Sequence, residues 1–209
     1  MLKKGIRVTA SGLLLLLVFS GISSVAQKQS KPLPKPHVVY VGTPYDVISI
    51  MIEMAQIKKE DLVYDLGCGD GRMVVLAAQK CLCRGIGYEI DPIIVQAANE
   101  NVLKNQMGSR VKIVNADIFT LDLRKATVLL LYLLPELNKR LLPQIDAMKP
   151  GTRIVCHNYD IPGIVADKTL TYLSNEDNTT HIMTRYTTPL KRMSSANVTP
   201  APAAPTVSR

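Results

Sequence analysis

The sequence lacks tryptophan and contains only two phenylalanines among its 209 residues. A nucleic-acid platform of interleaved stacking rings is therefore not expected. Acids are absent from the first 45 residues and from the last 21, which together contain nine Lys and Arg residues. The segment Asp46–Thr188 keeps 16 bases and all 17 acids, so its net charge is −1 although the chain carries +8. This excludes a strongly basic domain, and no nucleic-acid partner is predicted.

The first 26 residues have the pattern of an export signal or a membrane anchor. Three Lys and Arg residues precede 20 uncharged residues, with the apolar run Leu13–Phe19 at their centre. The small residues at 24–26 predict a signal peptide cleaved after Ala26. The alternative is an uncleaved anchor, because the stretch reaches the roughly 20 residues that span a bilayer. Both predict membrane association or export, with the domain periplasmic or anchored on the outer face.

The rest of the chain divides by composition. Residues 27–38 are a Pro- and Lys-rich linker, and residues 189–209 are predicted to be a disordered tail. Between them, residues 39–188 are long enough for one domain with its own core. The sequence shows no internal repeat and no spacing of Cys and His that predicts a metal site.

Strand and helix patterns alternate along this domain. Thr43 and Pro44 predict the N-cap and first residue of a helix that runs to Ala55. Strands are predicted at 62–66, 85–90, 111–115, 127–133 and 153–157, and further helices at 73–80, 92–104 and 135–148, the last interrupted near Pro143. The alternating segments 168–173 and 181–187 predict an antiparallel hairpin. The fold class is therefore α/β, a Rossmann-like doubly wound and mainly parallel sheet with a C-terminal hairpin.

The loop after the first predicted strand contains glycine at every second position. It reads Asp65-Leu66-Gly67-Cys68-Gly69-Asp70-Gly71-Arg72, and ligands of such sheets bind outside the carboxyl ends of the strands. A dinucleotide site is one interpretation, but Arg72 stands where that motif requires glycine. Two flanking carboxylates would also repel a diphosphate. The loop therefore favours a cationic or zwitterionic ligand.

Two more acids follow the next predicted strands. Glu89 ends the second strand, where a carboxylate can accept both hydroxyls of a ribose. Asp117 follows the third strand, where it can accept a hydrogen bond from an adenine amino group, with Ile118 packed on the ring. Together with Asp65, these acids are expected to face one crevice. A nucleoside with a positive centre and an amino-acid tail fits them, and S-adenosyl-L-methionine is such a molecule.

The stretches DLGCGDGR, GYEIDP and VNADIF resemble the class I S-adenosylmethionine-dependent methyltransferases. With YVGTP upstream and LYLLPELN downstream, the chain most resembles the ATP synthase c-subunit lysine methyltransferase family and its bacterial relatives. The resemblance covers about residues 39–188. It implies that the cofactor is S-adenosyl-L-methionine and that the fold is the class I methyltransferase fold.

The resemblance also implies roles for individual residues. The cofactor loop is formed by Gly67, Cys68, Gly69 and Gly71. Asp65 would help to hold the methionine ammonium, directly or through water, and Glu89, with Ile90 beside it, would bind the ribose. Asp117 and Ile118 would bind the adenine, while Tyr40 and Thr43 would close over the cofactor. The acceptor-side candidates are Tyr132, Leu134 and Pro135, and no catalytic base is assigned.

The function expected from this resemblance is S-adenosylmethionine-dependent methyl transfer to a protein lysine. Two alternatives remain open: a methyltransferase for a small molecule or lipid, and a non-catalytic nucleotide-binding module. The expected export of the domain conflicts with a cofactor that is made in the cytosol.

Overall fold

The computed structural model describes residues 41–193. Its centre is a seven-stranded sheet with the strand order β3-β2-β1-β4-β5-β7-β6. Five strands are mutually parallel, namely β1 (Leu62–Leu66), β2 (Arg84–Glu89), β3 (Val111–Asn115), β4 (Val128–Leu131) and β5 (Arg153–His157). The last two, β6 (Lys168–Leu173) and β7 (Thr180–Thr187), form an antiparallel hairpin, and β7 pairs with β5. The predicted doubly wound sheet with a C-terminal hairpin is confirmed.

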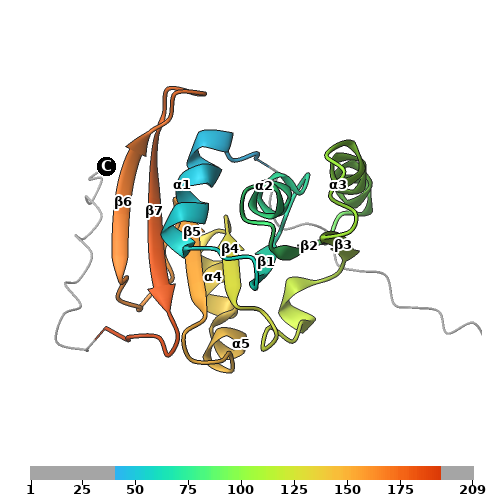
Figure 1. The fold of residues 1–209 in the computed structure, drawn as a ribbon. Helices are drawn as coiled ribbons and strands as arrows, with labels where there is room; N and C mark the ends of the chain where they lie inside the picture. Colours follow the sequence, from blue (N-terminus) through green and yellow to red (C-terminus); the bar gives the residue numbers. More distant parts are fainter. Residues whose placement is uncertain (1–40, 194–209) are drawn as a thin grey trace, which may run out of the picture. The chain divides into compact units, whose positions relative to one another are not determined.

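Helices cover both faces of this sheet (Figure 1). On one side lie α1 (Tyr45–Ala55), α2 (Arg72–Cys81) and α3 (Pro92–Lys104). On the other side lie the short helices α4 (Pro135–Arg140) and α5 (Leu142–Asp146). The chain runs outward from β1 to β3 and then returns to place β4 beside β1. The strand order therefore switches between β1 and β4, which is where ligands of such sheets bind.

The four residues of β4 show why this strand is central. All four are fully buried. Val128 and Leu130 pack in the cluster that contains α1, whereas Leu129 and Leu131 pack in the cluster that contains α5 residues. Successive side chains of a strand point to opposite faces. A strand covered on both faces must therefore be apolar throughout, as the continuous run in the sequence predicts.

Three helix boundaries can be compared with the predicted starts and ends of the helices. Asp91 caps α3 at the predicted start of the helix, because its carboxylate accepts a hydrogen bond from the Ile93 amide at 2.8 Å. Thr43 does not cap α1. Pro44 is the N-cap residue, and the Thr43 hydroxyl instead contacts the ring of His157. The predicted helix 135–148 divides at Leu141, two residues before Pro143, whose ring nitrogen has no proton to donate.

The C-terminal boundary of the domain differs from the prediction. Residues 189–193 do not belong to a disordered tail, because they are attached to the loop before β6. The Val165 amide donates to Lys191 O at 2.7 Å, the Met193 amide donates to Gly163 O at 2.9 Å, and Leu190 packs against the core. The apolar Leu190 and the bonded backbone together extend the domain to Met193.

The predicted signal or anchor at 1–26, the linker at 27–38 and Tyr40 lie outside the described residues. Within residues 41–193, none of the helices has the length and apolar character that a bilayer span requires.

Candidate functional site

A pocket lies at the carboxyl ends of β1, β2 and β4, beside the switch in strand order. Nine residues that the sequence singled out line it: Thr43, Gly67, Cys68, Glu89, Ile90, Asp117, Ile118, Tyr132 and Leu134. The structure therefore brings together residues spread over more than 90 positions of the chain. Gly69, Gly71, Asp65 and Pro135 are not on the pocket wall.

The glycine loop folds back over the end of β1. The amides of Gly67 and Cys68 both donate to Tyr88 O at 2.9 Å. Gly67, Gly69 and Gly71 have φ values of 75°, 54° and 74°, a region that residues with a Cβ rarely adopt. Gly69 and Gly71 thus shape the loop rather than face the pocket. The Cys68 thiol is a buried filler that burial keeps protonated, since it raises its pKa well above the usual value.

Glu89 joins this loop to the end of β2. One carboxylate oxygen accepts a hydrogen bond from the Gly69 amide at 3.0 Å. The other accepts from the amides of Ile90 and Asp91 at 2.8 and 3.0 Å. The side chain is only 8% exposed, yet it lines the pocket. These bonds fix the orientation of the carboxylate, and a carboxylate has about four acceptor positions, so one remains for a ligand.

Asp117 follows β3 and begins a short 3-10 helix, Ile118–Thr120. Its Oδ1 accepts a hydrogen bond from the Phe119 amide at 2.9 Å. The same cap places Ile118 and Phe119 on the pocket wall, with Ile94 of α3. One carboxylate edge thus lies beside an apolar surface, which suits a flat ring that carries an amino group.

Asp65 does not face the crevice with the other two acids, contrary to the prediction. It lies in the buried central strand at 1% exposure, and neither carboxylate oxygen has a hydrogen-bond partner among the described residues. Burial raises the pKa of Asp65 to about 8, with further increases from Glu89 and Asp70; the Val74 amide, which does not complete a well-formed hydrogen bond, opposes this to a smaller extent. Asp65 is therefore largely neutral at pH 7, and its carboxyl group does not reach the pocket wall.

Arg72 is a residue whose role the sequence did not reveal. Its guanidinium pairs with Asp70 at 2.8 Å and donates to the backbone oxygen of Thr43 at 3.2 Å. It also lies 5.4 Å from the centre of the Tyr45 ring. Arg72 therefore holds the segment before α1 against the glycine loop. The only sequence signal was the position of Arg72 directly after that loop.

The opposite wall of the pocket is aromatic and apolar. Tyr132 and Tyr159 stack with ring centres 6.0 Å apart, and Leu133, Leu134 and Leu137 complete the wall. Buried Asn138 donates to Leu133 O, Tyr159 O and Asp160 O, each at 3.2 Å. It thereby ties the loop after β4 to the loop after β5. Pro135 starts α4 instead of lining the pocket, because its fixed φ suits a first helical position.

The other pocket residues that the sequence did not single out are apolar or aromatic: Val41, Met73, Ile94, Phe119, Leu133, Leu137 and Tyr159. Most lie within a helical turn of a strand end or a predicted residue. Proximity to those ends is the only signal that could have identified them.

The residues present fit S-adenosylmethionine. The loop carries no side chain at Gly67, where a Cβ would be 3.0 Å from Leu133. Two carboxylates on successive strand ends match ribose hydroxyls and an adenine amino group, and apolar side chains flank them. The pocket wall has Arg72 as its only basic side chain among the described residues, and that side chain is paired with Asp70. A diphosphate would lack a cationic partner here.

Comparisons with known proteins agree with this site. Residues 65–168 match the family model of the ANTKMT methyltransferase domain. A protein-lysine N-methyltransferase from Saccharolobus islandicus is 41% identical over 130 residues, which are 61% of this chain and 81% of that protein. The adenine nucleotide translocase lysine N-methyltransferase of Mus musculus is 29% identical, over 60% of this chain but only 55% of its own length.

A solved structure of a methyltransferase is also similar to this chain. The crystal structure of an RNA methyltransferase from Salinibacter ruber in complex with S-adenosyl-L-homocysteine is 37% identical, with a TM-score of 0.65. The match covers 70% of this chain and 93% of that one. The chain therefore belongs to the class I S-adenosylmethionine-dependent methyltransferases and is related to the lysine methyltransferases of the adenine nucleotide translocase and of the ATP synthase c-subunit.

Proposed function

We propose that this protein transfers a methyl group from S-adenosylmethionine to the ε-amine of a lysine in a protein substrate. One observation carries the proposal: a single pocket joins the carboxylates Glu89 and Asp117 to the aromatic wall of Tyr132 and Tyr159. The carboxylate side suits a nucleoside, and the aromatic wall suits an alkyl-ammonium chain. The protein-lysine N-methyltransferase of Saccharolobus islandicus, at 41% identity, supports this assignment.

The cofactor side of the pocket binds and orients. S-adenosylmethionine, when bound, supplies a methyl group on a positively charged sulfur with a neutral leaving group. In this proposal the remaining acceptor position of Glu89 accepts a hydrogen bond from a ribose hydroxyl, and Asp117 accepts one from the adenine amino group. The glycine loop gives the amino-acid tail close access to the backbone. Asp65 acts only indirectly, through water or through the position of the loop.

The acceptor side aligns and desolvates the amine. Tyrosine faces attract a lysine ammonium group. Removal of water beside Leu134 and Tyr132 lowers the pKa of the amine, because desolvation disfavours its charged form. A neutral amine has the lone pair that attack on the methyl carbon requires. Alignment in a site without water contributes much of the rate of such a displacement.

The acceptor can be identified with tritiated S-adenosylmethionine. The protein is incubated separately with the protein, RNA and lipid fractions of cells that lack it. We expect tritium in the protein fraction, recovered as methyl-lysine after acid hydrolysis. Label in RNA or lipid would overturn the lysine assignment. Cofactor binding by calorimetry without label in any fraction would show a non-catalytic module.

We also propose that residues 1–26 direct the domain to the membrane, either as an export signal or as an anchor. Their basic start and 20-residue uncharged stretch support this proposal. Cell fractionation with protease protection tests it. We expect the domain in the membrane or exported fraction, and its recovery only in the cytosol would contradict the proposal.

A further inference from the structure

Four polar side chains form a hydrogen-bonded row from the pocket to the surface: Thr43, His157, His181 and Asp177. Oγ1 of Thr43, on the pocket wall, lies 3.1 Å from Nδ1 of His157. Nε2 of His157 lies 2.8 Å from Nδ1 of His181, whose Nε2 lies 3.1 Å from an Asp177 carboxylate oxygen. The first three residues are buried, whereas the Asp177 side chain is 39% exposed.

The exposed end of this row fixes the direction of every hydrogen bond in it. An amide hydrogen bond from Thr179 is the main cause that lowers the pKa of Asp177 to about 2, so this side chain is ionised at neutral pH. An ionised carboxylate can only accept. With His181 in its neutral form and its Nε2 proton directed to Asp177 and to the Thr179 hydroxyl 2.9 Å away, its Nδ1 accepts from Nε2 of His157, whose own Nδ1 is then an acceptor. The Thr43 hydroxyl therefore donates to His157, and its lone pairs remain for the pocket.

The surroundings keep the inner ring neutral. Burial and the neighbouring His181 lower the pKa of His157 to about 3, and Asp177 opposes this only weakly. The His157 ring also packs on Tyr132, with ring centres 4.1 Å apart. The other charged groups near the row are Arg72, whose guanidinium donates to Thr43 O at 3.2 Å, Asp46 of α1 and Glu176 of the turn between β6 and β7. Asp46 accepts a hydrogen bond from the turn, and Glu176 accepts hydrogen bonds from the start of α1.

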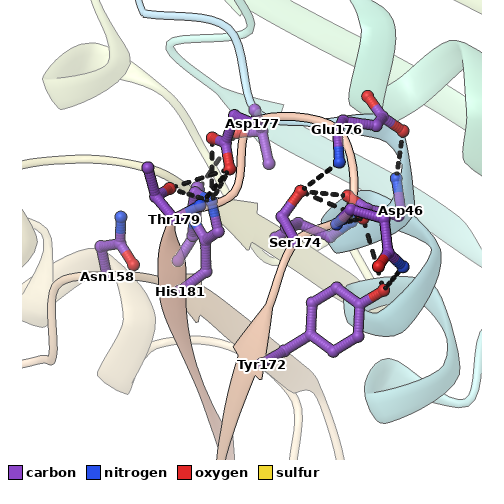
Figure 2. Close-up of polar contacts among 12 residues, drawn as sticks. Asp46, Asn158, Tyr172, Ser174, Glu176, Asp177, Thr179 and His181 are labelled. Carbon is purple, nitrogen blue, oxygen red and sulfur yellow. Dashed lines mark hydrogen bonds and ion pairs between the residues drawn. The ribbon is translucent and has the colours of Figure 1, made fainter.

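Figure 2 shows the hydrogen bonds between the turn that carries Asp177 and the start of α1. Glu176 accepts from the amides of Tyr45 and Asp46 at 3.0 and 2.9 Å, at the start of α1. Asp46 in return accepts from the Ser174 hydroxyl and the Asn175 amide of the turn. The segment that carries Thr43 and the turn that carries Asp177 are thereby tied to each other. We call this pair of contacts the reciprocal clamp.

We propose that the row from Thr43 to Asp177 is a proton relay, which removes a proton from the substrate lysine in the pocket and releases it at the β6–β7 turn. The inference rests on the proposed lysine methylation and names the path of its proton. His157 and His181 are positioning residues in this scheme, because they act through Thr43 and do not touch the substrate.

Each transfer along the relay moves one proton. The substrate ammonium gives one proton to the Thr43 hydroxyl while that hydroxyl passes its own proton to Nδ1 of His157. His157 passes the proton on Nε2 to Nδ1 of His181. The resulting imidazolium, paired with the Asp177 carboxylate, gives its Nε2 proton to water, so both rings are left as Nδ1–H tautomers and return to the Nε2–H form before the next turnover. One N–H bond of the substrate breaks, one proton enters the solvent, and the amine keeps the electron pair.

The pH dependence of methyl-lysine formation tests this scheme, with tritiated S-adenosylmethionine and the protein fraction as probes. For Asp177→Asn and Thr43→Val we expect kcat at pH 7.5 to fall about tenfold or more. The loss should shrink as the pH approaches the lysine pKa of about 10.4, because the neutral amine then binds without needing the relay. Thr43→Ser should restore activity, since it keeps the hydroxyl.

Controls separate the possible failures. Asp122→Asn removes a carboxylate from a different turn and should leave the rate unchanged. The same loss for Asp177→Asn at every pH would assign the row a structural role and overturn the relay. Absence of methyl-lysine from the wild-type protein would instead overturn the proposed function, and the relay with it.

The hydrogen-bond directions can be measured without turnover. Nitrogen-15 spectra of the wild-type imidazoles should show both rings as Nε2–H tautomers at neutral pH, with His157 still neutral at pH 5. A His157 ring that carries its proton on Nδ1, or that titrates near pH 6.5, would overturn the proposal even if a variant failed to fold.

Discussion

Glu89 has two tasks, since it orders the glycine loop and faces the ligand. For Glu89→Ala we expect the Kd for S-adenosylmethionine to rise about 10- to 100-fold, the equivalent of one or two charge-assisted hydrogen bonds. Calorimetry with the full chain measures the change. Glu100→Ala, which removes an exposed carboxylate from α3, is the matched control. Equal affinities for the wild type and Glu89→Ala would disprove the ribose contact.

Asp65 gives a pH dependence to stability. The pKa of its carboxyl is about 8 in the folded state against 3.8 for an ordinary aspartate, so between these values only the folded chain binds the proton. The free energy of unfolding then falls as the pH rises, by at most about 1.4 kcal/mol per pH unit.

Asp65→Asn removes this titration. We expect its free energy of unfolding, relative to the wild type, to increase steadily from pH 5 to pH 8 in urea titrations. A difference that stays constant over this range would show that Asp65 is ionised in the folded protein.

The contact between α2 and β2 depends on a missing side chain. A Cβ at Gly85 would lie 2.2 Å from Cγ2 of the fully buried Val74. Gly85→Ala should therefore destabilise the protein by about 1–3 kcal/mol through overpacking. Gly108→Ala is the control, because a Cβ there meets no atom within 4 Å. Denaturant midpoints measure both variants, and similar midpoints would contradict the close packing.

Most elements were predictable because their signals are local. The apolar run 127–133 predicts a strand buried on both faces, and Asp91-Pro92 predicts the start of α3. The capping role predicted for Thr43 was wrong because its hydroxyl has a partner 114 residues away, which no local pattern reveals. The pairing of His157 with His181 depends in the same way on the register between β5 and β7.

Many individual residues of the pocket could be predicted from the sequence, but their arrangement in space could not. Strand ends and glycines indicated nine of the residues that line the pocket, because parallel strands bring their carboxyl ends to one edge. The burial of Asp65 and the anchoring role of Arg72 depend on how the loop folds over β1. The strand order depends on the crossover connections between strands. The hydrophobic periodicity within each element carries no information about those connections.

Because the domain extends to Met193, we expect truncation before this residue to reduce the stability of the domain. A chain that ends at Thr188 loses the partly buried Leu190 and the ion pair of Lys191 with Asp167. We expect it to be less stable than a chain that ends at Met193 by about 1–2 kcal/mol, mainly from lost apolar burial. Urea titration of the two chains measures this, and equal stability would return the boundary to 188.

The reciprocal clamp has a consequence for the order of events during synthesis. Glu176 holds the start of α1 from a position 131 residues later in the chain than Tyr45. A ribosome adds roughly 5–20 residues per second, so the start of α1 emerges several seconds before its partner. The glycine loop and the first five strands can form in that interval. Arg72 can hold the segment that carries Thr43 within that interval, but its second attachment, from Glu176, forms only when the final hairpin has been made.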